Sequence, residues 1–168
     1  MGNYRKKTTY DKILEVIAIS ALVWAFYPLL FYYNIDSDAL LPTHFNLAGE
    51  ADGWGGRSIL WIIPPIALLF YIRLSVLQKF PKIYNYPCKI TEQNADYLYK
   101  MGEQLIRHIK VSVVLMFAFV SNDIYAVITG KLSSPNLLVI GILVAIMLLS
   151  IIIYIIKMKR YKPELYKN

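Results

Sequence analysis

The side chains most suited to chemistry are concentrated in one short stretch of this chain, residues 42–57. The stretch contains an imidazole, an amide, carboxylates and a guanidinium, together with glycines that permit tight turns and close backbone approach. Such groups can bind a ligand through charge and hydrogen bonds. The candidate ligand-binding residues here are His44, Asn46, Gly49, Glu50, Asp52 and Arg57.

Three of these residues, His44, Glu50 and Asp52, are also candidate metal ligands. Carboxylate oxygens are typical ligands of hard divalent cations, and imidazole nitrogen is a common ligand of transition metals. Their spacing matches no established metal-binding loop, so we assign no cofactor. A divalent cation stays a candidate ligand of this stretch, beside a peptide and a lipid headgroup.

Asp123 is a further candidate, because it lies within an apolar run of the sequence. It is about five residues from the end of that run, or roughly 7 Å deep in a helix. A carboxylate at the centre of a membrane costs up to about 3 kcal/mol and usually has a partner. We expect Asp123 to lie level with the polar stretch and to contact His44 or Arg57.

Four long apolar runs must position these residues. With 57% hydrophobic and 17% charged residues, the chain has fewer charges than the roughly 25% of a soluble domain. Each run is close to the roughly 20 residues that a helix needs to cross a bilayer. The sequence predicts an all-α membrane protein, a single domain over residues 1–168. The four predicted spans are residues 13–33, 58–77, 109–128 and 137–156.

Lysine and arginine are unevenly distributed among the segments between these runs. Along the chain, the five segments carry four, one, five, one and five of them. Because cytoplasmic segments are enriched in these residues, we expect both termini and residues 78–108 in the cytoplasm. Residues 34–57 then form an outer motif loop. The predicted location is the inner membrane of a bacterium, with the lipid bilayer as a partner and no role for nucleic acid.

The cytoplasmic loop, residues 78–108, has a pattern of its own. Residues 80–87 contain two prolines and are predicted to be extended. Thr91 is the predicted N-cap of an amphipathic helix, with Glu92 in its first turn. We expect this helix to lie on the inner leaflet and to run into the third span. The alternative is a docking surface for a cytoplasmic protein.

Three prolines, Pro28, Pro64 and Pro65, lie in the outer parts of the first two spans. Proline leaves backbone carbonyls without their helical donor and can bend the helix. One interpretation is ordinary bending, and the other is a widened outer vestibule. The single cysteine, Cys88, excludes an internal disulfide.

The motif stretch resembles a known family. Residues 41–46 (LPTHFN) and 49–55 (GEADGWG) are similar to the signature of a bacterial membrane domain of unknown function. That domain forms the N-terminal part of SdpI-type immunity proteins, which protect producer cells from a secreted peptide toxin. Residues 84–87 (YNYP) and 91–95 (TEQNA) also resemble the intracellular loop of its short members. The resemblance implies a short, four-span member with an outward-facing motif loop.

Three functions compete at this stage. The first is a binding or immunity and signalling module that uses the outer loop. The second is a small transporter or channel. Asn122 and Asp123 are the strongly polar residues noted within the spans, so a single copy of the chain offers no continuous polar path and an oligomer would have to build one. The third is a metal-dependent membrane enzyme. The absence of a nucleophile, base and orienting group at suitable spacing favours a protein that is not an enzyme.

Overall fold

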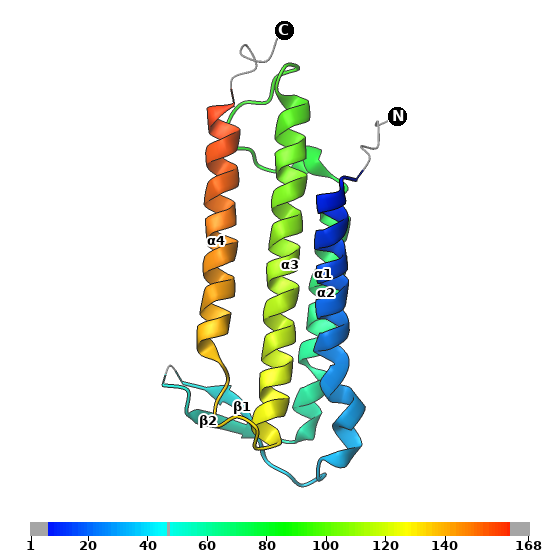
Figure 1. Cartoon of the computed structure of the whole chain (residues 1–168), viewed down its shortest axis with the longest axis vertical. Coiled ribbons are helices and arrows are strands. Elements are labelled where there is room, and N and C mark those ends of the chain that lie inside the picture. Colours follow the sequence, from blue (N-terminus) through cyan, green and yellow to red (C-terminus); the bar gives the residue numbers. More distant parts are fainter. Residues whose placement is uncertain (1–6, 47, 162–168) are drawn as a thin grey trace.

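The computed structural model describes residues 7–46 and 48–161, and four long helices dominate it (Figure 1). They are α1 (Thr9–Phe26), α2 (Ile63–Leu77), α3 (Ala95–Ile128) and α4 (Leu137–Arg160). Short 3₁₀ helices extend α1 over Tyr27–Asn34 and precede α2 over Arg57–Trp61. With these extensions, four helical stretches are long and apolar enough to cross a membrane. The prediction of a mainly helical protein with four such helices is confirmed.

The helices stand side by side, and the bundle has two distinct ends (Figure 1). The terminal end holds the start of α1, the end of α4 and the connection between α2 and α3. The hairpin end holds two strands and the connection between α3 and α4. Consequently α1 and α3 run in one direction, and α2 and α4 run in the other.

The strands β1 (Leu41–Phe45) and β2 (Ala51–Gly55) form an antiparallel hairpin at the hairpin end. This corrects the prediction of an all-α protein with a loop over residues 34–57. The strands are five residues long, contain a proline and glycines, and include register shifts on either side of His44. Such short, irregular strands lack the alternation of apolar and polar residues that identifies a strand in a sequence.

Helix α3 lies at the centre and packs against the other three helices. Its contact with α1 and α2 is built from small side chains, which let the helix axes approach closely. This core cluster consists of Ala21, Ala25, Ala67, Val114 and Ala118. A second cluster, made by Ile35, Leu41, Leu60 and Ile124, fastens the hairpin to the bundle. Apolar side chains therefore pack at this end of the bundle, where a widened vestibule was the alternative to ordinary bending at the three prolines.

At 34 residues, α3 is about 51 Å long at 1.5 Å per residue. The expected amphipathic helix and third span are one continuous helix, so residues 95–108 extend along the bundle axis rather than along a membrane surface. The helix begins after Asn94, not at the predicted cap Thr91. Asn94 folds back on the preceding turn, accepting from the Thr91 backbone and donating to the Lys89 carbonyl.

Two polar residues of α3 bond to carbonyls of α1 near Pro28. Pro28 has no N–H and cannot donate to the Trp24 carbonyl four residues before it, which accepts from the Tyr27 N–H instead. The hydroxyl of Ser121 donates to the Ala25 carbonyl at 2.8 Å, and the amide of Asn122 donates to the Trp24 carbonyl at 2.8 Å. Pro64 and Pro65 remove no hydrogen bond from within α2, because they lie in its first turn, where backbone N–H groups have no acceptor within the helix.

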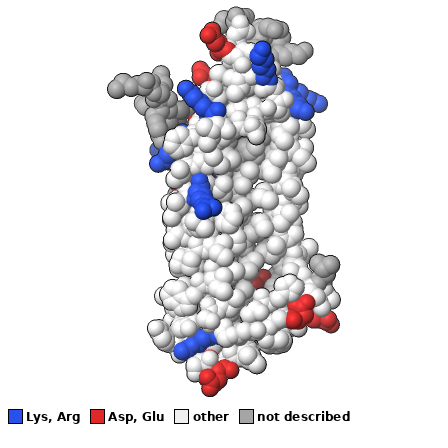
Figure 2. All heavy atoms as spheres, turned by 180° about the vertical axis from the view of Figure 1, so that it is seen from behind, with Lys and Arg blue, Asp and Glu red and all other residues white. Residues whose placement is uncertain are grey.

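Helix α4 is the most exposed of the four. Its buried residues, Ser150, Tyr154 and Met158, are four residues apart and form one strip along the helix. Figure 2 shows charged side chains gathered toward both ends of the molecule, separated by a long, almost uncharged band. Large apolar side chains of α1, α2 and α4 are exposed in this band.

Candidate functional site

The hairpin brings the central residues of the motif together. His44 pairs with Gly53 across the two strands, and Leu41 pairs with Gly55. A side chain at Gly53 would place a Cβ 3.0 Å from the Cβ of His44, and one at Gly55 would lie 2.8 Å from Thr43 Cγ2. The two glycines thus make room for the side chains of β1.

His44 and Asp52 form the most notable pair of this hairpin. The Nδ1 atom of His44 lies 2.5 Å from Oδ1 of Asp52, and the two side chains are 73% and 47% exposed. A carboxylate at Nδ1 orients the ring and favours the tautomer with the proton on Nδ1. The Nε2 atom then has a lone pair that can accept a hydrogen bond or bind a cation. No described residue bonds to that atom.

Asn46, Gly49 and Glu50 build the turn of the hairpin. The side-chain oxygen of Asn46 accepts from the backbone of Ala48 at 2.9 Å and of Glu50 at 3.0 Å. Its amide donates to the Glu50 carboxylate at 3.0 Å. Gly49 has a φ of 81°, a conformation that side-chain-bearing residues rarely adopt. These residues hold the loop that connects the strands, and the Glu50 carboxylate is already engaged.

The three candidate metal ligands do not come together. Within residues 7–46 and 48–161, no group of three or more His, Cys, Asp or Glu side chains is arranged to hold a metal ion. His44 and Asp52 are close to each other, whereas Glu50 bonds to Asn46. A divalent cation at the hairpin would therefore have to take part of its ligands from water or from a bound molecule.

Arg57 and Asp123 each have partners other than those expected. Arg57 donates to the Ile35 carbonyl at 2.8 Å, and its guanidinium lies 4.8 Å from the centre of the Tyr32 ring. Asp123 accepts from the backbone N–H of Asn136 at 2.8 Å. The predicted contact of Asp123 with His44 or Arg57 is wrong. Asp123 instead fixes the start of α4, where helix N–H groups attract an anion.

The terminal end contains a second polar region, which the sequence interpretation missed. Its first pair is Asp11 of α1 with Arg107 of α3, both buried. With its amide oxygen toward α3, Gln78 also accepts from Nε of Arg107 at 2.9 Å. Asp11 has a local role as well, since it forms a capping box with Thr8 at the start of α1.

The second pair joins Glu15 of α1 to Lys110 of α3. The ammonium of Lys110, whose side chain is 1% exposed, donates to Glu15 at 2.8 Å and to Ser75 of α2 at 3.1 Å. The Tyr71 hydroxyl donates to Glu15 at 2.7 Å, and the Tyr71 ring lies under the ammonium at 5.0 Å. Three helices thus meet at one set of charges.

We call Asp11, Glu15, Arg107 and Lys110 the buried charge cluster. The expectation that Asn122 and Asp123 are the strongly polar residues of the spans is wrong. Asp11 and Glu15 are four residues apart on α1, and Arg107 and Lys110 are three apart on α3. The sequence does contain a signal for this cluster. Two acids lie at helical spacing on α1, and two bases lie at helical spacing on α3, at the same end of the bundle.

The cluster is complete in itself. Its two anions face two cations, and no buried side-chain N or O atom among the described residues lacks a hydrogen-bond partner. Each charge faces an opposite charge, which offsets part of the cost of its burial. Structurally, the cluster sets the register of α1, α2 and α3. The hairpin pair, in contrast, is open to solvent.

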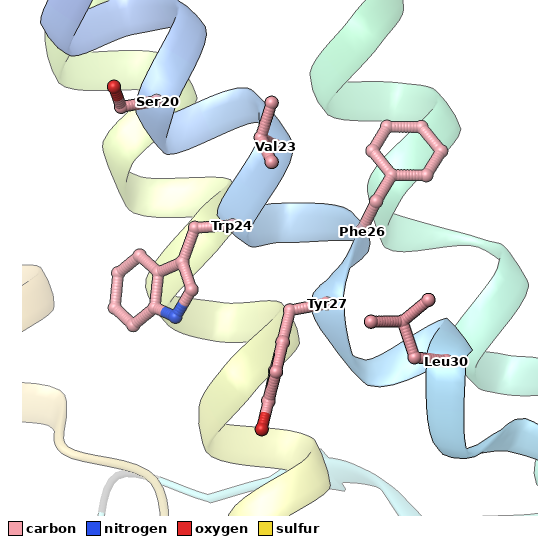
Figure 3. A pocket seen from close by; sticks show the side chains of 6 residues that line it. All are labelled: Ser20, Val23, Trp24, Phe26, Tyr27 and Leu30. Atoms are coloured by element: carbon pink, nitrogen blue, oxygen red, sulfur yellow. The ribbon is translucent and has the colours of Figure 1, made fainter.

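An apolar groove of about 400 Å³ lies on α1, where the α-helix changes to the 3₁₀ helix (Figure 3). Its lining residues are Ser20, Val23, Trp24, Phe26, Tyr27 and Leu30. The lining includes no residue of the hairpin and no charged side chain. The groove is therefore separate from both polar regions and suits a hydrocarbon chain better than a polar ligand.

Comparison with known proteins finds a similar archaeal protein. An uncharacterized protein of Archaeoglobus fulgidus is 30% identical over 134 residues, and the match covers 71% of this chain and 69% of the relative. No protein-family model matches the chain. No solved structure matches it either.

Proposed function

This chain belongs to the same family as the uncharacterized protein of Archaeoglobus fulgidus, and we propose that it is a multi-pass membrane protein that binds an external ligand through its hairpin. The binding residues in this proposal are His44 and Asp52. Asn46, Gly49 and Glu50 shape the hairpin, Arg57 ties the segment after β2 to the Ile35 carbonyl, and Asp123 fixes the start of α4.

The distribution of charge supports a cytoplasmic-membrane location with both termini inside. The hairpin end carries five carboxylates but only two cationic side chains, Arg57 and Lys131. Most lysines and arginines belong to the terminal end, which the positive-inside rule assigns to the cytoplasm. The exposed apolar band between the ends fits the hydrocarbon of a bilayer. The hairpin then faces outward.

The exposed His44–Asp52 pair is the observation that carries the proposal. Asp52 orients the imidazole, and the hairpin turn and its glycines hold both residues in place before any ligand arrives. A site that is already ordered loses less entropy on binding. The resemblance to the N-terminal part of SdpI-type immunity proteins supports a secreted peptide as the ligand, and an immunity or signalling role.

The packing gives less support to a transporter or channel. Between Lys110 and Ser121, the facing surfaces of α1, α2 and α3 are filled by Ala21, Ala67, Val114 and Ala118. This apolar layer separates the buried charge cluster from the polar residues of the hairpin end. A polar path would have to form between several subunits.

An enzymatic role also lacks support. A hydrolytic site would need a nucleophile within hydrogen-bond reach of the His44 base. The hydrogen bond of His44 described here is to Asp52, which can orient the ring but cannot attack a substrate. Binding is therefore the function that the geometry supports best.

The proposal is tested by thermal unfolding of the purified protein in detergent with divalent cations, lipids and secreted peptide toxins. A ligand that binds the folded state raises its stability by about 2.7 kcal/mol at 100 times its Kd. We expect one ligand class to raise the Tm of the wild type and to lose this effect in the double variant His44→Ala/Asp52→Ala.

Asp38→Ala is the matched control. Asp38 is an exposed acid at the same end, and no hydrogen bond of its carboxylate is seen. This variant should keep the full ligand-induced shift. For the immunity role, expression in a toxin-sensitive strain should protect growth with the wild type but not with the double variant. Equal shifts in wild type and double variant would contradict a binding role for His44 and Asp52.

A further inference from the structure

The connection between α2 and α3 exposes apolar side chains beside lysines. Phe80, which precedes the 3₁₀ helix Pro81–Ile83, is 53% exposed, and Ile83, the last residue of that helix, is 69% exposed. Lys79 and Lys82 alternate with them and are also exposed. Partly exposed apolar side chains beside lysines indicate a surface that contacts both hydrocarbon and charge.

Folding brings further cations to this region. The thiol of Cys88 lies 3.7 Å from the Met158 carbonyl, and the hydroxyl of Tyr97 lies 3.5 Å from the Lys157 carbonyl. The first contact places the connection, and the second places the start of α3, against the end of α4. We call the combined surface the basic collar. Its exposed members are Lys79, Lys82, Lys89, Lys157, Lys159 and Arg160.

The collar has few acidic neighbours along the connection. No aspartate or glutamate occurs from Gln78 to Ile90, a stretch that contains three lysines. The connection itself is therefore positively charged, and the acids Glu92, Asp96 and Glu103 follow it in the sequence. A complementary partner must be negative, and it must also accept the exposed Phe80 and Ile83.

The connection is held rigidly by its tyrosines. Tyr84 donates to the Leu77 carbonyl at 2.8 Å, and Tyr86 donates to the Pro81 carbonyl at 2.9 Å. Burial, reinforced by the nearby charge of Glu103, raises the pKa of Tyr84 to about 12, so its hydroxyl stays a donor at neutral pH. Both rings pack against α3 at Gly102, where an added Cβ would lie 2.7 Å from the Tyr86 oxygen. The lysines thus project from an ordered backbone.

We propose that the basic collar binds the headgroups of anionic phospholipids, with Phe80 and Ile83 in contact with the acyl chains. This inference rests on the proposed membrane placement. In that placement, α2 leaves the hydrocarbon at Leu77, so Lys79 and Lys82 lie at headgroup level. Lysines at this level are attracted to anionic lipids, and the attraction falls off within a Debye length.

The test uses the full chain in detergent, with phosphatidylglycerol or phosphatidylcholine added. Bound lipids are counted by native mass spectrometry, and the Tm is measured with each lipid. We expect the wild type to bind phosphatidylglycerol at least about ten-fold more tightly than phosphatidylcholine, with a larger rise in Tm. Raising the salt concentration should reduce the difference.

The variant Lys79→Gln/Lys82→Gln/Lys89→Gln should lose most of this preference. Lys131→Gln is the matched control, because Lys131 is also exposed but lies at the hairpin end. The control should keep the preference of the wild type. Removal of the apolar contacts by Phe80→Ser/Ile83→Ser should weaken the stabilisation by both lipids.

Two results would overturn the inference. One is that the wild type binds phosphatidylglycerol and phosphatidylcholine equally tightly, which would favour an acidic cytoplasmic protein as the partner of the collar. The other is a triple variant that keeps the wild-type preference, which would place headgroup binding elsewhere. A protein that stays soluble without detergent and enters no vesicle would instead contradict the proposed membrane placement.

Discussion

The two ends of the bundle each contain oppositely charged side chains, but in opposite surroundings. At the hairpin end, His44 and Asp52 meet in solvent on a two-stranded hairpin. At the terminal end, Asp11, Glu15, Arg107 and Lys110 meet between three helices, largely out of solvent. The comparison separates two uses of charge. The buried set determines how helices align, whereas the exposed pair is available to a ligand.

The energetics of the two sets differ for the same reason. Water screens an exposed pair, so such a pair contributes about 0–1 kcal/mol to folding. Removal of one member of a buried pair leaves a charge without compensation and costs about 3–5 kcal/mol. Substitutions at the two ends should therefore affect different measurements.

The largest effect is expected from Arg107→Met at the terminal end. The substitution leaves the buried Asp11 carboxylate without its guanidinium, which should lower the free energy of unfolding by about 3–5 kcal/mol. Denaturant-induced unfolding in detergent, followed by circular dichroism, measures the change. The double variant Asp11→Asn/Arg107→Met should recover part of the loss, because no uncompensated charge remains.

Arg73→Met is the matched control for this experiment. Arg73 is on α2 and exposed, so its replacement should change the free energy of unfolding by less than about 0.5 kcal/mol. Equal losses for Arg73→Met and Arg107→Met would contradict a special role of the buried charge cluster.

A smaller loss is expected from Asp123→Ala at the hairpin end. The substitution removes the acceptor of the Asn136 N–H and should cost about 1.5–3 kcal/mol, the range for hydrogen bonds to charged groups. The same unfolding experiment measures it. A double-mutant cycle of Asp123→Ala with His44→Ala should show additive effects, since the two residues have separate partners. Strong coupling would argue for the direct contact that the structure lacks.

Gly102→Ala should have an effect of about 1 kcal/mol. The added methyl group would meet Tyr84 and Tyr86 and cost about 1–3 kcal/mol, partly offset by the better helix propensity of alanine, roughly 1 kcal/mol. Gly141→Ala is the control, because a Cβ there meets nothing within 4 Å. A lower Tm for the first variant and an unchanged or higher Tm for the second is expected. The reverse order would contradict the packing of the connection.

The smallest effect on folding is expected from His44→Ala/Asp52→Ala. The pair is exposed, so the free energy of unfolding without ligand should fall by no more than about 1 kcal/mol. Ligand-induced stabilisation should nevertheless disappear. Thermal unfolding with and without ligand measures both quantities on one sample. A loss similar to that of Arg107→Met would show that the hairpin pair supports the fold.

The main features of the fold could be predicted because the length of each apolar run is the main structural signal in such a chain. Four runs of suitable length predicted four apolar helices, and the structure contains them. The hairpin could not be predicted in this way. Strands of five residues with Pro42 and Gly53 gain their stability from Leu41, which packs against Leu60 and Ile124 far along the chain.

The candidate sites show a similar limit. His44 and Asp52 could be singled out because both lie in one polar stretch, eight residues apart. The partner of Asp123 is a backbone N–H, which leaves no trace in the pattern of side chains. Arg107 was counted among the cytoplasmic charges, because its burial depends on the register of α3 against α1. Charge counting alone does not separate a buried cation from a surface one.

The hydrogen bonds around Pro28 have a consequence for motion. Ser121 and Asn122 hold the carbonyls of Ala25 and Trp24, and Arg107 holds Asp11 near the other end of α1. Sliding α1 along α3 by even one residue would break all of these bonds at once. The two helices must therefore move as one unit, without a piston-like stroke between them. Helix α4 packs mainly against α3, so a displacement along the bundle axis would meet the least resistance there.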